Sequence, residues 1–186
     1  MSKENADKEQ KRSFKREVFS WIACIVVTIL LTEFILNFVI INANIPSGSM
    51  ENTIMTNDKL IALRTSYWFN DPKRGDIIIF KYPDDESRLF IKRIIGLPGD
   101  KGETVLVKDG KVYINGSKKA LSEPYIKEEP VEDFGPYKVP KNGYFVMGDN
   151  RNNSNDAREW ETHYVSRDEV LGKAWFRYYP SIKVIK

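Results

Sequence analysis

The 186-residue sequence has one cysteine and one histidine, Cys24 and His163. A single cysteine excludes an intrachain disulfide, and this pair cannot supply a multi-histidine or cysteine-rich zinc site. The CxxCH motif of a covalently attached haem is also absent from the sequence. We therefore expect no metal and no cofactor, so a catalytic site would have to use serine, threonine, lysine, aspartate, glutamate or tyrosine.

The sequence has no large excess of either charge, with 29 Lys and Arg against 26 Asp and Glu. It has no basic stripe, so nucleic acid is not expected as a partner. The apolar residues, in contrast, are concentrated in residues 18–41, where Glu33 is the one formal charge. At about 1.5 Å per residue this run makes a helix of about 36 Å, against a hydrocarbon core of about 30 Å. It is too long for the apolar region of a cleaved signal peptide, so we predict a retained transmembrane helix.

The distribution of basic residues predicts the orientation of this helix. Six basic and four acidic residues precede the run, and no lysine or arginine follows it until Lys59. Because positive residues stay on the cytoplasmic side, we predict a single-pass protein of the cell membrane. Residues 1–17 form a polar, disordered cytoplasmic tail, residues 18–41 form the anchor, and residues 42–186 form an extracytoplasmic domain.

Two polar residues of the predicted anchor, Glu33 and Asn37, stand four apart and share one helix face. They could contact another membrane protein or the substrate. They could equally be tolerated polar residues near the outer leaflet, which is the interpretation we favour.

After Ile45 the sequence predicts a mainly β domain with antiparallel sheets. Short runs of β-branched and aromatic residues alternate there with Gly, Pro, Asn and Asp. Asp109-Gly110 predicts a two-residue hairpin, and the apolar run 76–80 predicts a strand covered on both faces. The Pro-rich and charged segment 117–140 predicts an extended loop. Strands are predicted over 60–64, 76–82, 88–96, 103–108, 111–116, 143–149 and 170–179.

Two ways of activating a serine are open to this composition. A Ser-His-Asp triad would need His163, but the charged surroundings EWETHYVSRD favour a surface or locally bonded histidine. Alternatively, a lysine made neutral by burial can act as the base. Lys92 fits that description, because it stands in the apolar run FIKRII. Side chains alternate along a strand, so Lys92 and Arg93 point to opposite faces, and one of the two faces is less exposed to solvent. Edge strands also carry lysine for solubility, so this pattern alone does not decide.

The segment IPSGSM (45–50) presents Ser47 and Ser49 on a short turn after the anchor. One hydroxyl can attack while the other donates to the oxyanion alongside a backbone N–H. A plain linker turn has the same composition. The second polar segment, GDNRNNSNDAR (148–158), is either a loop with Asx-turns or a paired charge network that makes the loop rigid.

Taken in order, IPSGSM, RGDIIIFKYP, FIKRIIGLPGD and GDNRNNSNDAR resemble the successive sequence boxes of bacterial type I signal peptidases. These are membrane-bound Ser/Lys endopeptidases that remove signal peptides from exported proteins. The resemblance runs from the anchor to VLGKAWFRYYP. It implies a largely antiparallel β catalytic domain, an acyl-enzyme mechanism and cleavage after small residues of the Ala-x-Ala type. The implied partners are signal peptides of secreted preproteins, membrane lipid and the secretion translocon.

The resemblance also implies roles for individual residues. Ser49 matches the nucleophile, and Lys92 matches the general base, where the endoplasmic-reticulum branch has histidine. Ser47 matches the hydroxyl that completes the oxyanion hole with the Ser49 N–H, and Ser154 matches the serine that orients the lysine. The remaining matches are charged supports (Arg93, Asp149, Asp156, Arg158) and residues lining small substrate pockets (Ile45, Pro46, Met50, Ile91).

The sequence departs from the family pattern at three positions: Asn52 replaces a usual proline, Ala157 a common serine and Glu161 a common glycine. Two other functions share some of these features. Self-cleaving repressors use a Ser/Lys pair, but they are soluble and carry a DNA-binding domain, which this sequence does not show. A non-catalytic, membrane-anchored β module could bind exported proteins or assist pilus assembly, but it would not need Ser49, Lys92 and Ser154 together.

Overall fold

The computed structural model describes residues 3–185 and divides into two compact units, Met1–Val39 and Ile40–Lys186. The first unit contains helix α1 (Lys3–Phe34) and the π-helical turn η1 (Ile35–Val39). The prediction of a disordered tail is therefore wrong from Lys3 onward, since that segment is the first part of α1. Residues 1 and 2 of the predicted tail lie outside the described residues.

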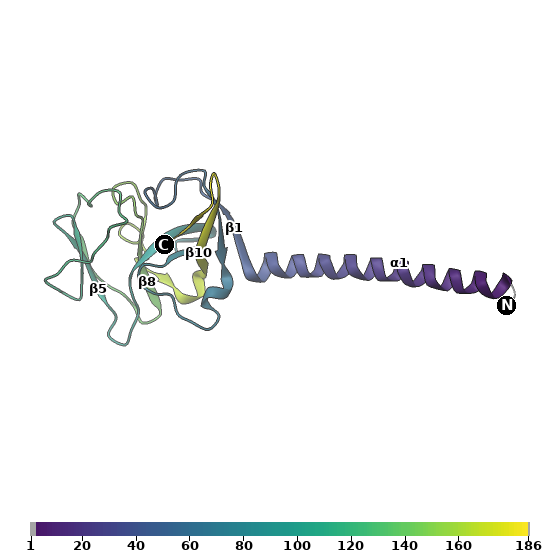
Figure 1. Cartoon of the computed structure of the whole chain (residues 1–186). Coiled ribbons are helices and arrows are strands. Elements are labelled where there is room, and N and C mark those ends of the chain that lie inside the picture. The colour runs from purple at the N-terminus through teal and green to yellow at the C-terminus, as the bar shows by residue number, and fades with distance from the viewer. Residues whose placement is uncertain (1–2, 186) are drawn as a thin grey trace. The chain divides into compact units, whose positions relative to one another are not determined.

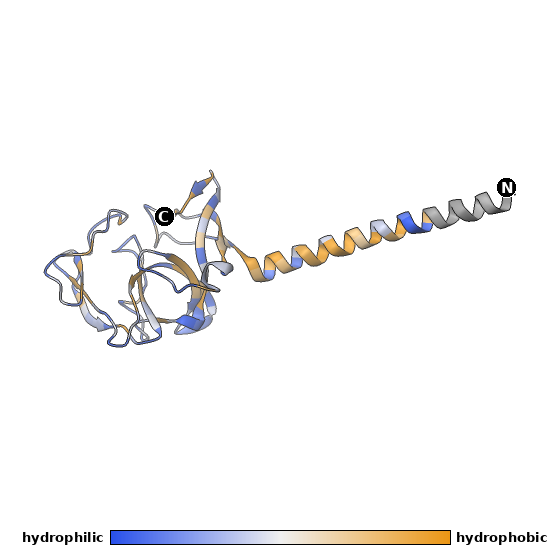
Figure 2. Ribbon diagram, turned by 60° about the horizontal axis from the view of Figure 1, so that its bottom comes forward, coloured by the Kyte–Doolittle hydropathy of each residue, from blue (hydrophilic) through white to orange (hydrophobic). Residues whose placement is uncertain are grey.

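One stretch of this unit, Phe14–Val39, is long and apolar enough to cross a membrane. Its 26 residues correspond to about 39 Å of helix, and Figure 2 shows the apolar residues gathered along this part of the helix. Glu33 and Asn37 are paired, because the Asn37 Nδ2 donates to Glu33 Oε2 at 3.1 Å. A local partner makes a carboxyl group easier to accommodate in an apolar segment, which fits the interpretation of Glu33 as a tolerated polar residue.

The second unit is mainly antiparallel β, as predicted (Figure 1). Within residues 3–185 its larger sheet has eight strands in the order β1-β2-β10-β3-β4-β8-β9, with β11 paired to β10. The 3₁₀ turns η2 (Arg64–Tyr67) and η3 (Arg167–Glu169) connect some of these strands. The strands are β1 (Ile40–Asn44), β2 (Lys59–Leu63), β3 (Ile77–Tyr82), β4 (Asp85–Gly96), β8 (Gly143–Met147), β9 (Val165–Ser166), β10 (Val170–Tyr179) and β11 (Lys183–Val184).

Strand β1 begins inside the run predicted as the anchor. Ile40 pairs with Leu63 and Ile41 with Ala62 of β2, and Ile41 is buried. The apolar run therefore contains both the end of a helix and the start of a strand. Hydrophobicity does not separate the two, because a lipid-facing helix and a buried strand are both continuously apolar.

Strand β3 is buried on both faces, which confirms the prediction for the run 76–80. Ile78 and Phe80 belong to one cluster of buried side chains, and Ile77 and Ile79 belong to another. Two cores thus lie on opposite sides of this strand. Its neighbour β4, which is the strand that carries Lys92, separates the same two environments.

A smaller sheet has the order β6-β5-β7, with β5 (Thr104–Lys108), β6 (Lys111–Ile114) and β7 (Phe134–Lys138). The predicted hairpin is confirmed, since Asp109 and Gly110 have φ of 50° and 74° and Lys108 pairs with Lys111. The prediction of a loop over all of 117–140 is wrong, because β7 lies within it. A proline interrupts β7 at position 136, but β7 is an edge strand with a register shift there, where proline is tolerated.

Candidate active site

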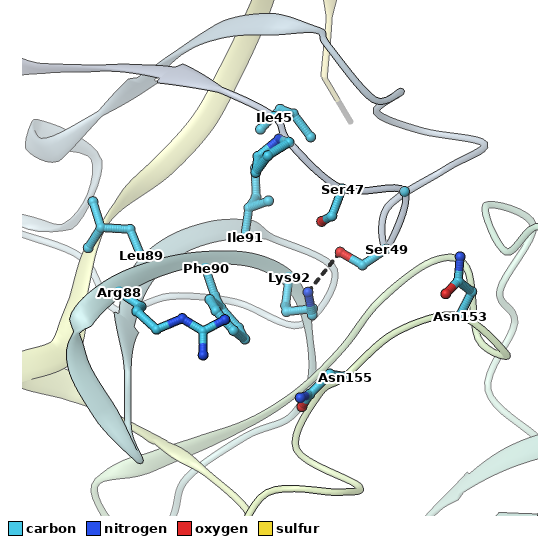
Figure 3. Close-up of a pocket in the computed structure, with 12 residues that line it drawn as sticks. Ile45, Ser47, Ser49, Arg88, Leu89, Phe90, Ile91, Lys92, Asn153 and Asn155 are labelled. Carbon is cyan, nitrogen blue, oxygen red and sulfur yellow. Dashed lines mark hydrogen bonds between the residues drawn. The ribbon is translucent and has the colours of Figure 1, made fainter.

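The turn that carries the two candidate serines follows directly after β1. The Ile45 N–H donates to the Asp58 carbonyl at 3.0 Å, which fixes the start of the turn. Ser47 is exposed, whereas Ser49 is 8% exposed. Figure 3 shows the two serine side chains next to each other at one edge of a pocket. The turn therefore presents one buried and one accessible hydroxyl to the same space.

The loop 148–158 holds this turn from the other side. The Asn150 N–H donates to the Ser49 carbonyl at 3.1 Å, and its Nδ2 donates to the Gly48 carbonyl at 2.9 Å. A Cβ on Gly148 would stand 2.4 Å from the Ser49 carbonyl oxygen and 2.2 Å from Ser154 Oγ, so this close approach requires glycine. Sequence reasoning did not single out Asn150 or Gly148; their place in the GDNRNNSNDAR segment was the available signal.

Lys92 lies on β4 in register with the buried Ile78 of β3. Its Nζ is 2.8 Å from Ser49 Oγ (Figure 3), and Lys92 is only 4% exposed. Burial lowers the pKa of Lys92 to about 8, because desolvation disfavours the ammonium form. The charges of Asp156 and Asp149 oppose that shift and the charge of Arg158 adds to it. A fraction of this amine is therefore neutral near neutral pH.

A cluster of aromatic rings forms the apolar surroundings of Lys92. The amine lies 5.2 Å from the centroid of the Phe90 ring. Phe90 stacks on Tyr82 with centroids 4.5 Å apart, and it packs against Phe80 and Trp160 at 6.5 and 6.0 Å. Phe90, which these other rings pack against, lies beside the amine and helps to keep water away from it.

Ser154 is close to the turn through Gly148, but its hydrogen bond is to another residue. The Ser154 hydroxyl donates to Asp156 Oδ2 at 2.8 Å. Within residues 3–185 no hydrogen bond joins Ser154 to Lys92, so the orienting role implied by the resemblance stays a prediction.

The four charged supports are buried and form two ion pairs. Arg93 donates to the two carboxylate oxygens of Asp149 at 2.9 and 2.7 Å. Arg158 donates to the two oxygens of Asp156 at 2.8 and 2.9 Å. The paired network predicted for the loop 148–158 is thus present, but Asp149 takes its arginine from β4. The Arg93–Asp149 pair fixes the loop against the strand that carries Lys92, whereas the Arg158–Asp156 pair lies within the loop.

A cavity of about 450 Å³ opens in front of Ser49 and Lys92. A second cavity of about 240 Å³ lies along β1 and β4. Of the four residues that the resemblance assigns to substrate pockets, Ile45, Pro46 and Ile91 line both cavities, whereas Met50 lines neither because it is fully buried in the core under the turn. Sequence reasoning did not predict six of the residues lining the larger cavity: Gly48, Arg88, Leu89, Phe90, Asn153 and Asn155. For Asn153 and Asn155 the GDNRNNSNDAR segment was the available signal.

His163 takes no part in this arrangement. Its Nδ1 lies 2.8 Å from the Ala157 carbonyl oxygen, and its ring packs on Tyr137 with centroids 4.4 Å apart. The prediction of a locally bonded histidine is therefore confirmed. Among residues 3–185 no group of three or more His, Cys, Asp or Glu side chains is arranged to hold a metal ion.

The known proteins to which this chain is similar are described as signal peptidases. The sequence profile of the family described as "Signal peptidase, peptidase S26" matches residues 18–179. The chain is 45% identical over 165 residues to "Probable signal peptidase I-2" of Synechocystis sp., covering 86% of this chain and 72% of that protein. It is 35% identical over 188 residues to "Signal peptidase I" of Bacillus licheniformis, covering 96% and 97% of the two chains.

A solved structure, that of a signal peptidase I from Enterococcus faecalis V583, is 36% identical, covers 56% of this chain and 97% of that one, and has a TM-score of 0.47. The family match spans most of the chain, and the relatives are similar over most of their own length. The chain therefore belongs to the signal peptidase family, peptidase S26, whose members cleave signal peptides from preproteins.

Proposed function

We propose that this chain is a membrane-anchored serine endopeptidase in which Ser49 is the nucleophile and Lys92 the general base. The observation that carries the proposal is the 2.8 Å contact between Lys92 Nζ and Ser49 Oγ in a site where both residues are buried. A lysine can accept a proton only when it is neutral, and burial favours that form. No other residue type is needed for the first proton transfer.

In the proposed reaction, neutral Lys92 takes the proton of the Ser49 hydroxyl as Oγ attacks the scissile carbonyl. The Ser47 hydroxyl and the Ser49 N–H donate to the oxyanion that forms. Lys92 then gives its proton to the leaving amine, and the peptide C–N bond breaks to leave an ester on Ser49. Water, activated by Lys92, hydrolyses the ester and releases the signal peptide. Loss of one oxyanion donor typically lowers the rate by about 10²–10³.

The substrate would bind as an extended chain along two open strand edges. β1 is at the edge of its sheet, and β8 pairs with β4 only from Arg93 onward, so residues 88–91 have a free edge beside the cavities. Backbone hydrogen bonds to such edges hold a peptide without regard to its sequence. Ile45 and Ile91 line both cavities and present apolar side chains there, which suits small side chains of the Ala-x-Ala type.

The stretch Phe14–Val39 would anchor the enzyme in the membrane with its N-terminus in the cytoplasm and residues 42–186 outside. This orientation rests on the basic residues before the span. It would bring the site to membrane lipid and to preproteins leaving the secretion translocon.

The test is cleavage of a signal-peptide substrate by full-length variants in detergent. Ser49→Ala and Lys92→Ala should each lose at least about 10³-fold in kcat/KM, because the first removes the proposed nucleophile and the second the proposed general base. Lys81→Ala is the matched control, since Lys81 stands on the adjacent strand β3 in an exposed pair with Glu86. It should keep activity within about twofold.

A serine-acylating inhibitor separates this enzyme from a non-catalytic binding module. Mass spectrometry should find the acyl group on Ser49 in the natural sequence and none in Ser49→Ala. Near-normal cleavage by either active-site variant, or acylation of another serine, would overturn the assignment.

A further inference from the structure

Behind the active site lies a segment to which neither the family boxes nor the proposed mechanism gives a role. Residues Glu123–Val131, here called the strap, connect β6 and β7 and were predicted as part of a loop. None of these residues lines the cavity in front of Ser49. The strap instead contacts three parts of the chain that surround the nucleophile turn: residues 51–52, Arg93 and residues 149–152.

The centre of the strap covers the buried ion pair. The Arg93 guanidinium lies 3.8 Å from the centroid of the Tyr125 ring, a distance at which the ring face attracts the cation. The Lys127 N–H donates to the Asp149 carbonyl at 3.0 Å. The strap therefore contacts both members of the Arg93–Asp149 pair. The residue after Asp149 is Asn150, whose N–H and Nδ2 hold the carbonyls of Ser49 and Gly48.

Asn52 joins the strap directly to the nucleophile turn. Its Nδ2 donates to the carbonyls of Tyr125 at 3.0 Å and Ile126 at 3.3 Å. Asn52 has a φ of 89°, which asparagine tolerates and which proline, fixed near −65°, cannot adopt. Next to it, Lys127 Nζ lies 2.8 Å from Glu51 Oε2. The asparagine in place of the family's usual proline therefore comes with a different backbone and with two new bonds to the strap.

Both ends of the strap are fixed to the loop 148–158. Arg151 donates to the two carboxylate oxygens of Glu123 at 2.8 and 2.6 Å, with side chains 0% and 6% exposed. The Asn152 amide bonds the Glu129 carbonyl at 3.0 Å and the Val131 N–H at 2.9 Å. The strap is thus fastened at both ends and in the middle.

We propose that the strap is a positioning element for catalysis, in which Tyr125 and Asn52 hold the Arg93–Asp149 pair and the turn of Ser49 in register with Lys92. The inference rests on the proposed function, since it presupposes Ser49 and Lys92 as the reacting pair. Because the strap lies outside the substrate cavity, loosening it changes the rate of the chemical step and leaves substrate binding unchanged. Misplacing a reacting atom by about 1 Å can lower a rate by about 10²-fold.

Tyr125→Leu is the direct test, and Tyr125→Phe is its matched control. Leucine removes the ring face over Arg93. Phenylalanine keeps that face and removes only the hydroxyl bond to Glu123 Oε1, which is 2.8 Å long. We measure kcat and KM of the full-length protein on a signal-peptide substrate. The concentration of active enzyme is the concentration of Ser49 that a serine-acylating inhibitor has labelled when its reaction is complete, and kcat is calculated per labelled Ser49. Tyr125→Leu should lower kcat about tenfold or more with KM within about twofold, while Tyr125→Phe stays within about twofold of the natural sequence in both.

Asn52→Gly is the second variant and keeps the experiment informative if Tyr125→Leu does not fold. Glycine accepts the φ of 89° but has no amide to bond the strap. It should lower kcat about threefold to tenfold with KM unchanged, which corresponds to the loss of one or two hydrogen bonds. Asn52→Pro, which restores the family residue, should lower kcat more, because proline cannot adopt this backbone.

A merely structural strap would reduce the number of labelled molecules and leave kcat per labelled Ser49 unchanged. That result for both Tyr125→Leu and Asn52→Gly, or a rise in KM at constant kcat, would overturn the inference. Ser49→Ala has no Ser49 to label, so its cleavage rate is measured per total protein, and this variant keeps the two proposals apart. If Ser49→Ala retains activity, the proposed function fails; if it is inactive while the strap variants turn over normally, only the positioning role fails.

Discussion

Lys92 and Arg93 are consecutive residues of β4, both basic and both buried, yet the two faces of the strand treat them in opposite ways. On one face Lys92 stands opposite Ile78 and beside Phe90, with the Ser49 hydroxyl as its hydrogen-bond partner. On the other face Arg93 donates to both oxygens of Asp149 and to the Gly75 carbonyl at 2.8 Å. The surroundings, and not the charge of the residue type, therefore decide what each side chain does.

The difference in surroundings gives the two side chains different chemical properties. A guanidinium held in a fork by a carboxylate keeps its charge and can fix two segments together. A buried amine beside an aromatic ring, with a hydroxyl and not a carboxylate as its partner, loses its charge more readily and becomes able to accept a proton. In the proposed mechanism, one face of the strand carries a structural ion pair and the other carries the general base, one residue apart.

The largest effect is expected on the Arg93 face, from Asp149→Asn. It leaves the buried guanidinium without its counter-charge, and breaking a buried pair typically destabilises a protein by about 3–5 kcal/mol. Chemical denaturation of the full-length protein, followed by tryptophan fluorescence, measures the free energy of unfolding. Asp100→Asn is the control, because the Asp100–Lys141 pair has side chains 90% and 80% exposed. It should lose less than about 1 kcal/mol. Equal losses in the two variants would contradict the scaffold role.

A smaller effect of opposite sign is expected on the Lys92 face, from Lys92→Met. The pKa of Lys92 falls from 10.5 to about 8 on folding. Below pH 8 the burial of the charged amine therefore lowers the free energy of unfolding by about 3 kcal/mol. This reduction shrinks as pH rises from 8 to 10.5, where the unfolded chain binds more protons than the folded one. The inactive methionine variant should therefore be more stable by about 1–3 kcal/mol at pH 7, after subtracting its lost hydrogen bond.

The same variant should show little or no gain at pH 10, and that pH dependence is the decisive part of the measurement. Lys118→Met, at an exposed position in the turn after β6, is the control and should be indifferent to pH. A Lys92→Met variant less stable than the natural sequence at pH 7 would mean that the amine is bound as a charge, like Arg93.

The sequence was enough to place Lys92 and Arg93 on opposite faces, because alternation along a strand is local. It did not determine which of the two side chains lies beside aromatic rings. That depends on Tyr82, Phe80 and Trp160, which come from other strands and loops and surround Phe90 only in the folded chain. The approach of Ser49 to Lys92, 43 residues apart, likewise came from the resemblance and not from any local pattern.

The errors in the fold have similar causes. Ile40 and Ile41 extend an apolar helix in sequence, but their pairing with β2 makes them a strand. Prolines and charges around Pro136 predict a loop, but an edge position in the small sheet accepts them. In the sequence, Asn52 is a departure from the proline usual in the family. In the structure its positive φ and its hydrogen bonds connect the nucleophile turn to the strap. In each case the deciding contact lies far along the chain.

The smallest of the three effects is the pH dependence of the reaction. In the proposed mechanism only neutral Lys92 accepts the Ser49 proton, so kcat/KM should rise about tenfold per pH unit below pH 8 and level off above it. At pH 7 about a tenth of the enzyme is in the active form. The measurement uses a peptide without groups that titrate between pH 6 and 10.

Acylation of Ser49 by an inhibitor is the internal control, because it needs the same proton transfer and no leaving amine. Its rate should follow the same curve, since in both reactions the limiting quantity is the fraction of Lys92 without its proton. A rate that is flat from pH 6 to 9, or that falls as pH rises, would mean that Lys92 acts as a charge. The two faces of β4 would then differ in their partners but not in their chemistry.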